Sequence, residues 1–345
     1  MSLRATSEAI FHGKYLPLFL VVVLYILIFL VRYQQGGWEV KFDLWSSVRE
    51  SIDQRISQTL PSPQAELLSG ILLGQNKQLP PELRLAFRDT STLHIVVASG
   101  QNLSLLAGFF LNLAGLIKRK NAILLSLLAV IFYTLLSGVQ VPILRAAVMF
   151  SLAAGAQLYG RQNLGWQTLI ITAGLMLLVN PRWISDLSFQ LSFLATFGVV
   201  VVAPILLRYL NKFPLLGADL AVTLGAQIMV SPVIIQSFHQ LSLVGVITNL
   251  LVGWTVPFIM VLGTLLIFTS LIFSGLAFVF SIASSVLLTY FIYIVYFFAS
   301  LSFAWEYVGE QVWIVWVGYY MVVAAIVLLL KNVKTANSAR SSESS

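Results

Sequence analysis

The stretch "GLAFVFSIASSVLLTYFIYIVYFFASLSFA" (275–304) contains no charged residue and exceeds the roughly 20 apolar residues that a helix needs to cross a bilayer. Similar stretches recur along nearly the whole chain. Of its 345 residues, 59% are hydrophobic and 10% are charged, and the mean hydropathy is +0.91. Strands of an outer-membrane barrel would instead be short and alternate apolar with polar residues. Because backbone groups in lipid must be hydrogen-bonded internally, the sequence predicts an all-α, polytopic transmembrane helical bundle.

About ten membrane-spanning helices are expected, some of them broken or kinked, together with one external amphipathic helix. Prolines and glycines within the apolar segments indicate the breaks and kinks. The expected spans are 15–32, 94–117, 121–137, 142–160, 164–180, 187–208, 218–237, 243–270, 275–304 and 310–330.

The formal net charge of +7 lies mostly in the loops between these spans. In the ten-span arrangement most basic loops share one side of the membrane with the N-terminus, and Glu306 and Glu310 lie on the other. The positive-inside rule therefore predicts cytoplasmic N- and C-termini in a multi-pass protein of the cell inner membrane. A dedicated polyanion site is the alternative explanation of the basic loops, which contain Lys118, Arg119, Lys120, Arg161, Arg208, Lys212, Lys331 and Lys334.

Four regions are expected along the chain. Residues 1–32 form an N-terminal membrane anchor helix, 33–93 an external linker with short helices, and 94–330 the main transmembrane domain. Residues 331–345 are polar and low in complexity, which predicts a disordered cytoplasmic tail.

The external amphipathic helix is expected at 44–60. Apolar residues recur there every four positions, with Arg49, Glu50, Asp53 and Arg55 on the other faces, and two following prolines end the helix. Such a helix either lies in the membrane interface or forms a lid or collar over an entrance.

No catalytic machinery is recognisable in the sequence. There is no cysteine, only three histidines occur, and no phosphate-binding glycine loop or metal-binding motif is present. His94 and Ser99 would lie about 140° apart on an intact helix, so they do not form a nucleophile–base pair. We expect no enzyme activity, no cofactor and no metal ion.

Polar side chains instead gather in "HIVVASGQNLSLLAG" (94–108). On a helical wheel one face contains His94, Gln101, Gly108 and Asn112, with Ser99 and Asn102 on its flanks. Ser99-Gly100 is a possible helix break, which is tolerated at membrane depth where the backbone lines a cavity. The face therefore either lines a pathway or holds neighbouring helices together through hydrogen bonds.

Later segments contain further polar groups. Arg145 either snorkels to the interface or offers a permanent cation to a phosphate or a carboxylate. Asp186, which shares a helix face with Gln190, either caps its helix or forms a salt bridge with Arg145. Gln227 lies in mid-span, and Asn249 is a further polar residue in an apolar segment.

Several ordered blocks together resemble the competence domain of ComEC-type DNA-uptake channels, over roughly residues 45–270. They are "GILLGQNKQLPPELRLAFRDTSTLHIVVASGQNLSLLAG" (70–108), "VPILRAAVM" (141–149), "NPRWISDLSFQLSFLATFG" (180–198), "LGAQIMVSPV" (224–233) and "LVGVITNLLVGWTVP" (243–257). The resemblance implies a cytoplasmic-membrane channel that translocates single-stranded DNA into the cell during natural transformation. The matching positions are Gly74, Pro80, Arg84, Phe87, His94, Ser99, Gly100, Arg145, Asp186, Gln190, Ser192, Phe193, Gln227 and Asn249.

The resemblance also implies partners. Besides single-stranded DNA and membrane lipid, these are an external DNA receptor, a cytoplasmic ATP-driven motor and a separate nuclease. The external entrance is expected at Arg84, Phe87 and Arg88. The oligomeric state is not implied by the sequence.

Three departures from the family pattern stand out. Asn102 occupies a position where family members often have a second histidine. The chain also lacks the external OB-type domain and the C-terminal metallo-β-lactamase-like domain of the family. A nuclease activity is therefore expected from another protein.

Two other functional classes fit the residues alone. A secondary transporter or permease for a small solute also uses broken helices and polar groups near the membrane midplane. A non-transporting membrane subunit of a larger complex is the third hypothesis.

Overall fold

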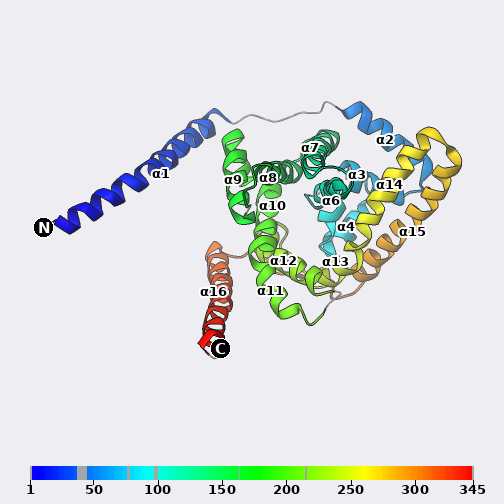
Figure 1. The fold of residues 1–345 in the computed structure, drawn as a ribbon. Helices are drawn as coiled ribbons and strands as arrows, with labels where there is room; N and C mark the ends of the chain where they lie inside the picture. The colour runs from blue at the N-terminus through cyan, green and yellow to red at the C-terminus, as the bar shows by residue number, and fades with distance from the viewer. Residues whose placement is uncertain are drawn as a thin grey trace.

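The computed structural model describes residues 2–36, 45–75, 78–96, 100–162, 164–213 and 216–343 (Figure 1). Nearly all of them are helical, which confirms the expected all-α fold. The helices are α1 (Ser2–Gln35), α2 (Ser46–Thr59), α3 (Gln64–Leu73), α4 (Pro81–Asp89), α5 (Leu93–Val96), α6 (Gly100–Asn112), α7 (Arg119–Leu136), α8 (Val141–Leu158), α9 (Gly165–Val179), α10 (Leu187–Phe197), α11 (Ala203–Leu210), α12 (Gly217–Phe238), α13 (Gly245–Gly253), α14 (Thr255–Ile272), α15 (Ser274–Ala299) and α16 (Trp313–Glu343).

Two 3₁₀ turns, η1 (Leu113–Gly115) and η2 (Pro181–Ser185), and a π-helical turn, η3 (Gly198–Val202), complete the helical part of the described chain. Two three-residue strands, β1 (Gln240–Ser242) and β2 (Trp305–Tyr307), pair antiparallel with Gln240 opposite Tyr307. This ribbon joins the end of α12 to the loop that follows α15.

Within the described residues, seven helices are long and apolar enough to cross a membrane, and three shorter apolar helices accompany them. Of the expected span 94–117, the structure describes α5, which ends at Val96, and α6, which begins at Gly100; residues 97–99 lie outside the described residues. The expected span 187–208 is one continuous helix, Leu187–Leu210, that contains the π-helical turn η3, and the expected span 243–270 is divided between α13 and α14. The described residues thus have irregular helices near two glycines, a π-helical turn that starts at Gly198 and an interruption after Gly253.

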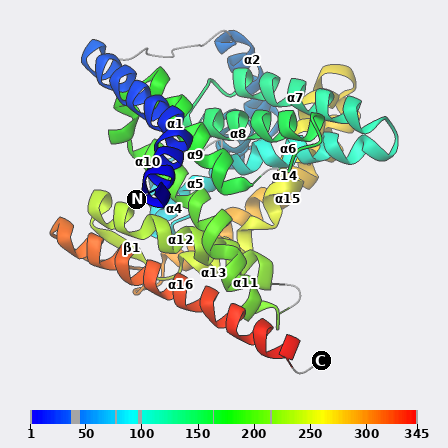
Figure 2. The ribbon, with the colours of Figure 1, turned by 60° about the vertical axis from the view of Figure 1, so that its left-hand side comes forward.

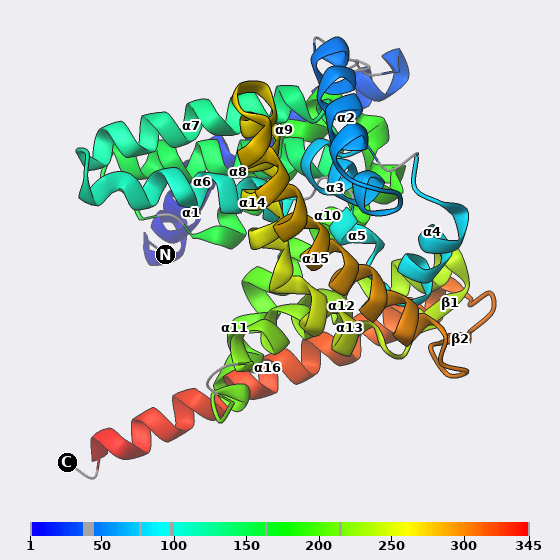
Figure 3. The same cartoon turned by 90° about the vertical axis from the view of Figure 1, so that its right-hand side faces the viewer.

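A first hydrophobic core joins the described part of the 33–93 segment to α14 and α15. The side chains of α3 from Leu67 to Leu73 are buried, and they pack with residues of α2, α4, α14 and α15. Since "QAELLSGILL" is apolar on nearly all sides, α3 is stable only when other helices surround it. Figure 3 shows α14 and α15 side by side, with α2 and α3 against their upper half.

The polar face of α2 differs from expectation. Arg49 and Asp53 are buried together with Ile56, although the sequence pattern placed these charges on the outer faces. The Ser69 hydroxyl of α3 donates a hydrogen bond to the Asp53 carboxylate, and Nη1 of Arg49 donates to the Leu136 carbonyl at 3.3 Å. Of the expected 44–60 helix, residue 44 lies outside the described residues.

A second core lies between α6, α7 and α8. Leu103 and Ala107 of α6 pack against Val130 and Tyr133 of α7 and Ile143 of α8. Figure 3 shows these three helices as one layer that extends away from α14 and α15. The Ser126 hydroxyl of α7 donates to the Ala107 carbonyl at 2.9 Å, which fixes α7 against α6.

The helices α10 and α12 cross closely at two glycines. A side chain at Gly225 would lie 2.8 Å from the Gly198 carbonyl oxygen and 3.0 Å from the Ala203 nitrogen. Only glycine permits this approach, which places α10, η3 and α11 against α12.

The last helix, α16, lies beneath α11, α12 and α13 (Figure 2). Pro232 within α12 has no N–H, so it cannot donate to the Ile228 carbonyl four residues earlier. The Tyr319 hydroxyl donates to that carbonyl at 2.9 Å, and the Tyr320 hydroxyl donates to the Met229 carbonyl at the same distance. Tyr319 therefore supplies the donor that the proline lacks, and Tyr320 adds a second hydrogen bond from α16 to α12.

Both chain ends form long helices. In α1, the Tyr25 hydroxyl donates to the Gly174 carbonyl of α9 at 3.2 Å, and Nη2 of Arg32 donates to the Val179 carbonyl at 2.9 Å. At the other end, α16 continues to Glu343 through most of the expected tail 331–345. No proline or glycine occurs between 331 and 343 to end the helix.

Candidate functional site

The first candidate residue, Arg145, is the fifth residue of α8 and is only 9% exposed. It does not snorkel to the surface. Its Nε donates to the Ser192 hydroxyl at 2.7 Å, and its Nη1 donates to the Thr196 hydroxyl, both on α10. Nη1 also lies 3.7 Å from the Met149 sulfur. Every one of these partners is uncharged, so the contacts hold the guanidinium in place without neutralising it.

Gly100, the first residue of α6, lies against the same guanidinium. A β-carbon at this position would be 2.7 Å from Nη2 of Arg145 and 3.1 Å from the β-carbon of Ala146. A side chain here would push the end of Arg145 out of this position, so the glycine leaves room for the guanidinium. Arg145 thus lies where α6, α8 and α10 meet, and two predicted residues, Gly100 and Arg145, are brought together.

Of the two roles predicted for Asp186, the structure shows the helix cap. An oxygen of its carboxylate accepts a hydrogen bond of 2.8 Å from the backbone N–H of Phe189 at the start of α10. The predicted salt bridge with Arg145 is absent, and none of the described acidic side chains pairs with Arg145. A carboxylate at a helix N-terminus is stabilised by the cap bond and the helix dipole, so it needs no arginine.

The predicted face of 94–112 is divided between two helices. His94 belongs to the single turn α5, where Nδ1 lies 3.0 Å from the Ser91 carbonyl oxygen. Gln101 and Asn112 remain on one side of α6, and both are exposed. A β-carbon on Gly108, between them, would meet no atom within 4 Å, so this side of α6 is open.

Asn102 is fully buried rather than at the edge of that face. Its side-chain nitrogen donates to the Ile71 carbonyl of α3 at 2.8 Å. Asn102 therefore joins the first core to the second, the hydrogen-bonding role that the sequence offered as the alternative to a pathway. Ser99 lies outside the described residues.

The remaining predicted polar residues lie apart from Arg145. Gln190 donates from its side-chain nitrogen to the Ile184 carbonyl at 2.9 Å and so closes the loop before α10. Gln227 and Asn249 are half-buried in α12 and α13. The structure does not gather these residues into one compact site.

The entrance residues on α4 differ in exposure. Phe87 is fully buried and packs edge-on against Phe291 of α15, with ring centroids 6.0 Å apart. It is therefore a core residue and not part of an open surface, because its side chain lies on the apolar face of an amphipathic helix. Arg84 and Arg88 are exposed on the same helix, and Nε of Arg88 pairs with Asp89 at 3.2 Å.

Comparison with known proteins assigns the chain to a family. The model of the family described as competence protein matches residues 71–333, about three quarters of the chain. The chain belongs to the competence protein family.

The competence-family chain is similar to three curated proteins. ComE operon protein 3 of Bacillus subtilis is 28% identical over 61% of this chain and 27% of its own length. An uncharacterised protein of Escherichia coli, YcaI, is 30% identical over 58% of this chain and 28% of its own length. An uncharacterised protein of Aquifex aeolicus is 33% identical over 38% of this chain and 32% of its own length. The chain thus spans a third or less of the length of these relatives. No solved structure matches.

The sequence did not single out Thr196 of this competence-family protein. Thr196 follows Ser192 by four residues, so both hydroxyls lie on one face of α10, and this spacing is a detectable signal. The spacing does not reveal that α8 packs on that face of α10 and brings the buried Arg145 to the two hydroxyls. Among the described residues, no group of three or more histidine, aspartate or glutamate side chains is placed to hold a metal ion.

Proposed function

We propose that this membrane protein acts in competence as a channel that translocates single-stranded DNA across the cytoplasmic membrane during natural transformation. Membership of the competence family and the seven apolar helices support a membrane role in DNA uptake. The channel itself, its cargo and its partners are the proposal.

The observation that carries the proposal is the buried guanidinium of Arg145, which pairs with none of the acidic side chains in the described part of the chain. A buried charge is costly unless it is paired, and hydroxyl partners satisfy only its N–H groups. A planar guanidinium matches the oxygens of a phosphate, which would supply the missing negative charge. Arg145 is the point at which the DNA backbone would be held as it passes between α6, α8 and α10.

A hydrated surface for the rest of the strand would come from the open side of α6. Gln101, Ser104 and Asn112 are exposed there, with Phe109 beside them at 61% exposure. Single-stranded DNA is held by backbone contacts and by stacking of its bases on aromatic rings. An amide- and hydroxyl-bearing surface with an exposed phenylalanine supplies both kinds of contact.

The proposal includes an orientation and partners. With the basic loops cytoplasmic, Arg145 lies near the external ends of α8 and α10, where an incoming strand would arrive. We propose that an external receptor delivers DNA, that a cytoplasmic ATP-driven motor pulls it, and that a separate nuclease degrades the second strand. The chain itself acts as a channel and not as an enzyme.

A marker-transformation assay tests this function. The chain is expressed in a naturally transformable host whose own channel gene has been deleted, and transformants are counted with membrane levels matched by immunoblot. The proposal predicts that transformation is restored. Uptake of small solutes without transformants, from protein correctly inserted in the membrane, would contradict it and favour a permease.

A further inference from the structure

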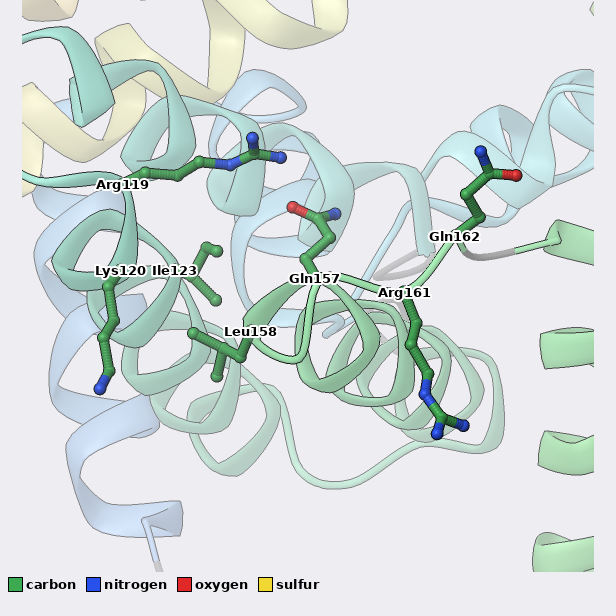
Figure 4. Close-up of a pocket in the computed structure, with 8 residues that line it drawn as sticks. Arg119, Lys120, Ile123, Gln157, Leu158, Arg161 and Gln162 are labelled. Carbon is green, nitrogen blue, oxygen red and sulfur yellow. The ribbon is translucent and has the colours of Figure 1, made fainter.

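A basic depression lies at the ends of α7 and α8 that the positive-inside rule places at the cytoplasmic surface. Its volume is about 390 Å³, and it is lined by Arg119, Lys120, Ile123, Gln157, Leu158, Gly160, Arg161 and Gln162 (Figure 4). It is formed by the first turn of α7, the last turn of α8 and the residues that follow α8.

The lining combines cations with apolar groups. Three of the eight lining residues carry a positive charge at neutral pH: Arg119, Lys120 and Arg161. Figure 4 shows Arg119 extending from α7 toward Gln157 of α8, with Ile123 and Leu158 between the two helices. Ile123 is buried and Leu158 is 37% exposed, so the depression has an apolar floor below a basic rim. Within the described residues no acidic side chain lines it.

Exposed aromatic residues beside the depression indicate that it lies at the level of the lipid headgroups. Tyr159, directly after α8, is 86% exposed, and Trp166 in the first turn of α9 is 47% exposed. Exposed tyrosine and tryptophan side chains beside apolar spans are typical of the headgroup level. Beyond Ile123, the outer face of α7 is apolar and exposed, with Leu128 at 64% and Ile131 at 51%. An acyl chain would therefore have an apolar surface along α7.

We propose that this depression binds the phosphate-bearing headgroup of an anionic phospholipid. Arg119 and Gln157, which approach each other in Figure 4, would contact the phosphate, and Ile123 and Leu158 would contact the glycerol and upper acyl carbons. The side chains of Lys120, Arg161 and Gln162 point away from Arg119 in the free protein, and those of Lys120 and Arg161 are long enough to turn toward the bound headgroup. Basic pockets between transmembrane helices on the cytoplasmic side bind anionic headgroups in this way.

The site is separate from the proposed strand path. Arg145 and Gln157 are twelve residues apart on α8, which corresponds to about 18 Å along the helix axis. Binding of lipid here would stabilise the α7–α8 pair at the opposite end from Arg145. The inference therefore stands whether or not the chain conducts DNA.

Native mass spectrometry of the full chain in detergent tests the proposal. The probes are phosphatidylglycerol and, as the zwitterionic comparison, phosphatidylcholine with the same acyl chains. The pocket variant is Arg119→Gln with Arg161→Gln. The matched control is Arg208→Gln with Lys212→Gln, which removes the same charge from the exposed last turn of α11 and the residues that follow it.

We expect wild type to retain phosphatidylglycerol in preference to phosphatidylcholine. The pocket variant should lose about tenfold in this preference, because each cation near an anionic headgroup contributes to binding, and the control should retain it. Equal loss in both variants, or equal retention of the two lipids by wild type, would overturn the proposal.

A second measurement needs no variant. Phosphatidylglycerol with a photoreactive group on its headgroup is crosslinked to the wild-type protein in vesicles, and labelled peptides are mapped. Labelling is expected within 119–123 and 157–162. Labelling confined to other segments would overturn the proposal. So would its displacement by inorganic phosphate, which would indicate a free-anion site, or by a short single-stranded oligonucleotide, which would indicate a nucleic-acid site.

Discussion

Nε of Arg145 and the hydroxyl of Ser192 are joined by a hydrogen bond of 2.7 Å that connects α8 to α10. Together with the contact between Arg145 and Thr196, it sets the position of a buried cation from a neighbouring helix. If Arg145 contacts DNA, substitutions at Ser192 and Thr196 should reduce DNA uptake, because they change the position of the guanidinium even though neither residue touches the strand.

The double variant Ser192→Ala with Thr196→Val removes both hydroxyl acceptors of Arg145. Hydrogen bonds to charged groups contribute about 1.5–3 kcal/mol each, so the guanidinium should leave its position. Transformation frequency should fall about tenfold or more at unchanged membrane level. Ser188→Ala, on an exposed position of α10, is the control, and an equal fall in that variant would contradict a specific effect.

Gly100→Ala should also reduce transformation, because the new β-carbon would lie 2.7 Å from Nη2 of Arg145. The guanidinium is the end of a flexible side chain, so it should move away from the new methyl group and from its hydroxyl partners rather than destabilise the fold. Gly108→Ala on the same helix adds the same methyl group where no atom lies within 4 Å. If the two variants transform equally well, Gly100 is not required for the position of Arg145.

Asp186 should behave as a cap and not as an ion-pair partner. Asp186→Asn keeps an oxygen that can accept from the Phe189 N–H, so it should retain most of the thermal stability of the purified protein. Asp186→Ala should lose about 0.5–2 kcal/mol, measured by intrinsic fluorescence during heating. Equal losses in both variants would show that the charge of Asp186 matters more than its cap bond.

The tyrosines of α16 give a double-mutant test. Tyr319→Phe leaves the Ile228 carbonyl without its donor and should cost about 1 kcal/mol of unfolding free energy. In a Pro232→Ala background the backbone N–H of residue 232 can donate to that carbonyl, so the same change should cost less. An identical cost in both backgrounds would contradict the proposed compensation.

The fold class was predictable because hydropathy and length alone define membrane helices. The position of α3 was not, since a segment of ten residues is too short to be recognised as part of the bundle. Its burial against α14 depends on helices that lie far away in the sequence. The buried charges of α2 were missed for the same reason, because a helical wheel does not show which faces find partners.

The candidate site was predictable in part. The sequence named Gly100 and Arg145, and the ordered motifs placed them in the family, but the wheel treated 94–112 as one continuous helix. His94 lies in α5 and Gln101 in α6, and Asn102 is buried in the core. The salt bridge with Asp186 was chemically reasonable, yet the helix cap satisfies the carboxylate locally, and this leaves Arg145 with hydroxyl partners.

The most direct test of the account is the transformation frequency of Arg145→Gln, with Arg208→Gln as the matched loss of an exposed arginine. Both variants are expressed in the deletion host at equal membrane level, beside Arg145→Lys, which keeps the charge but loses the planar fork. The account predicts that Arg145→Gln abolishes transformation, Arg145→Lys retains part of it, and Arg208→Gln transforms like wild type. Transformation by Arg145→Gln at the wild-type frequency would contradict the central claim that this buried cation contacts the DNA strand.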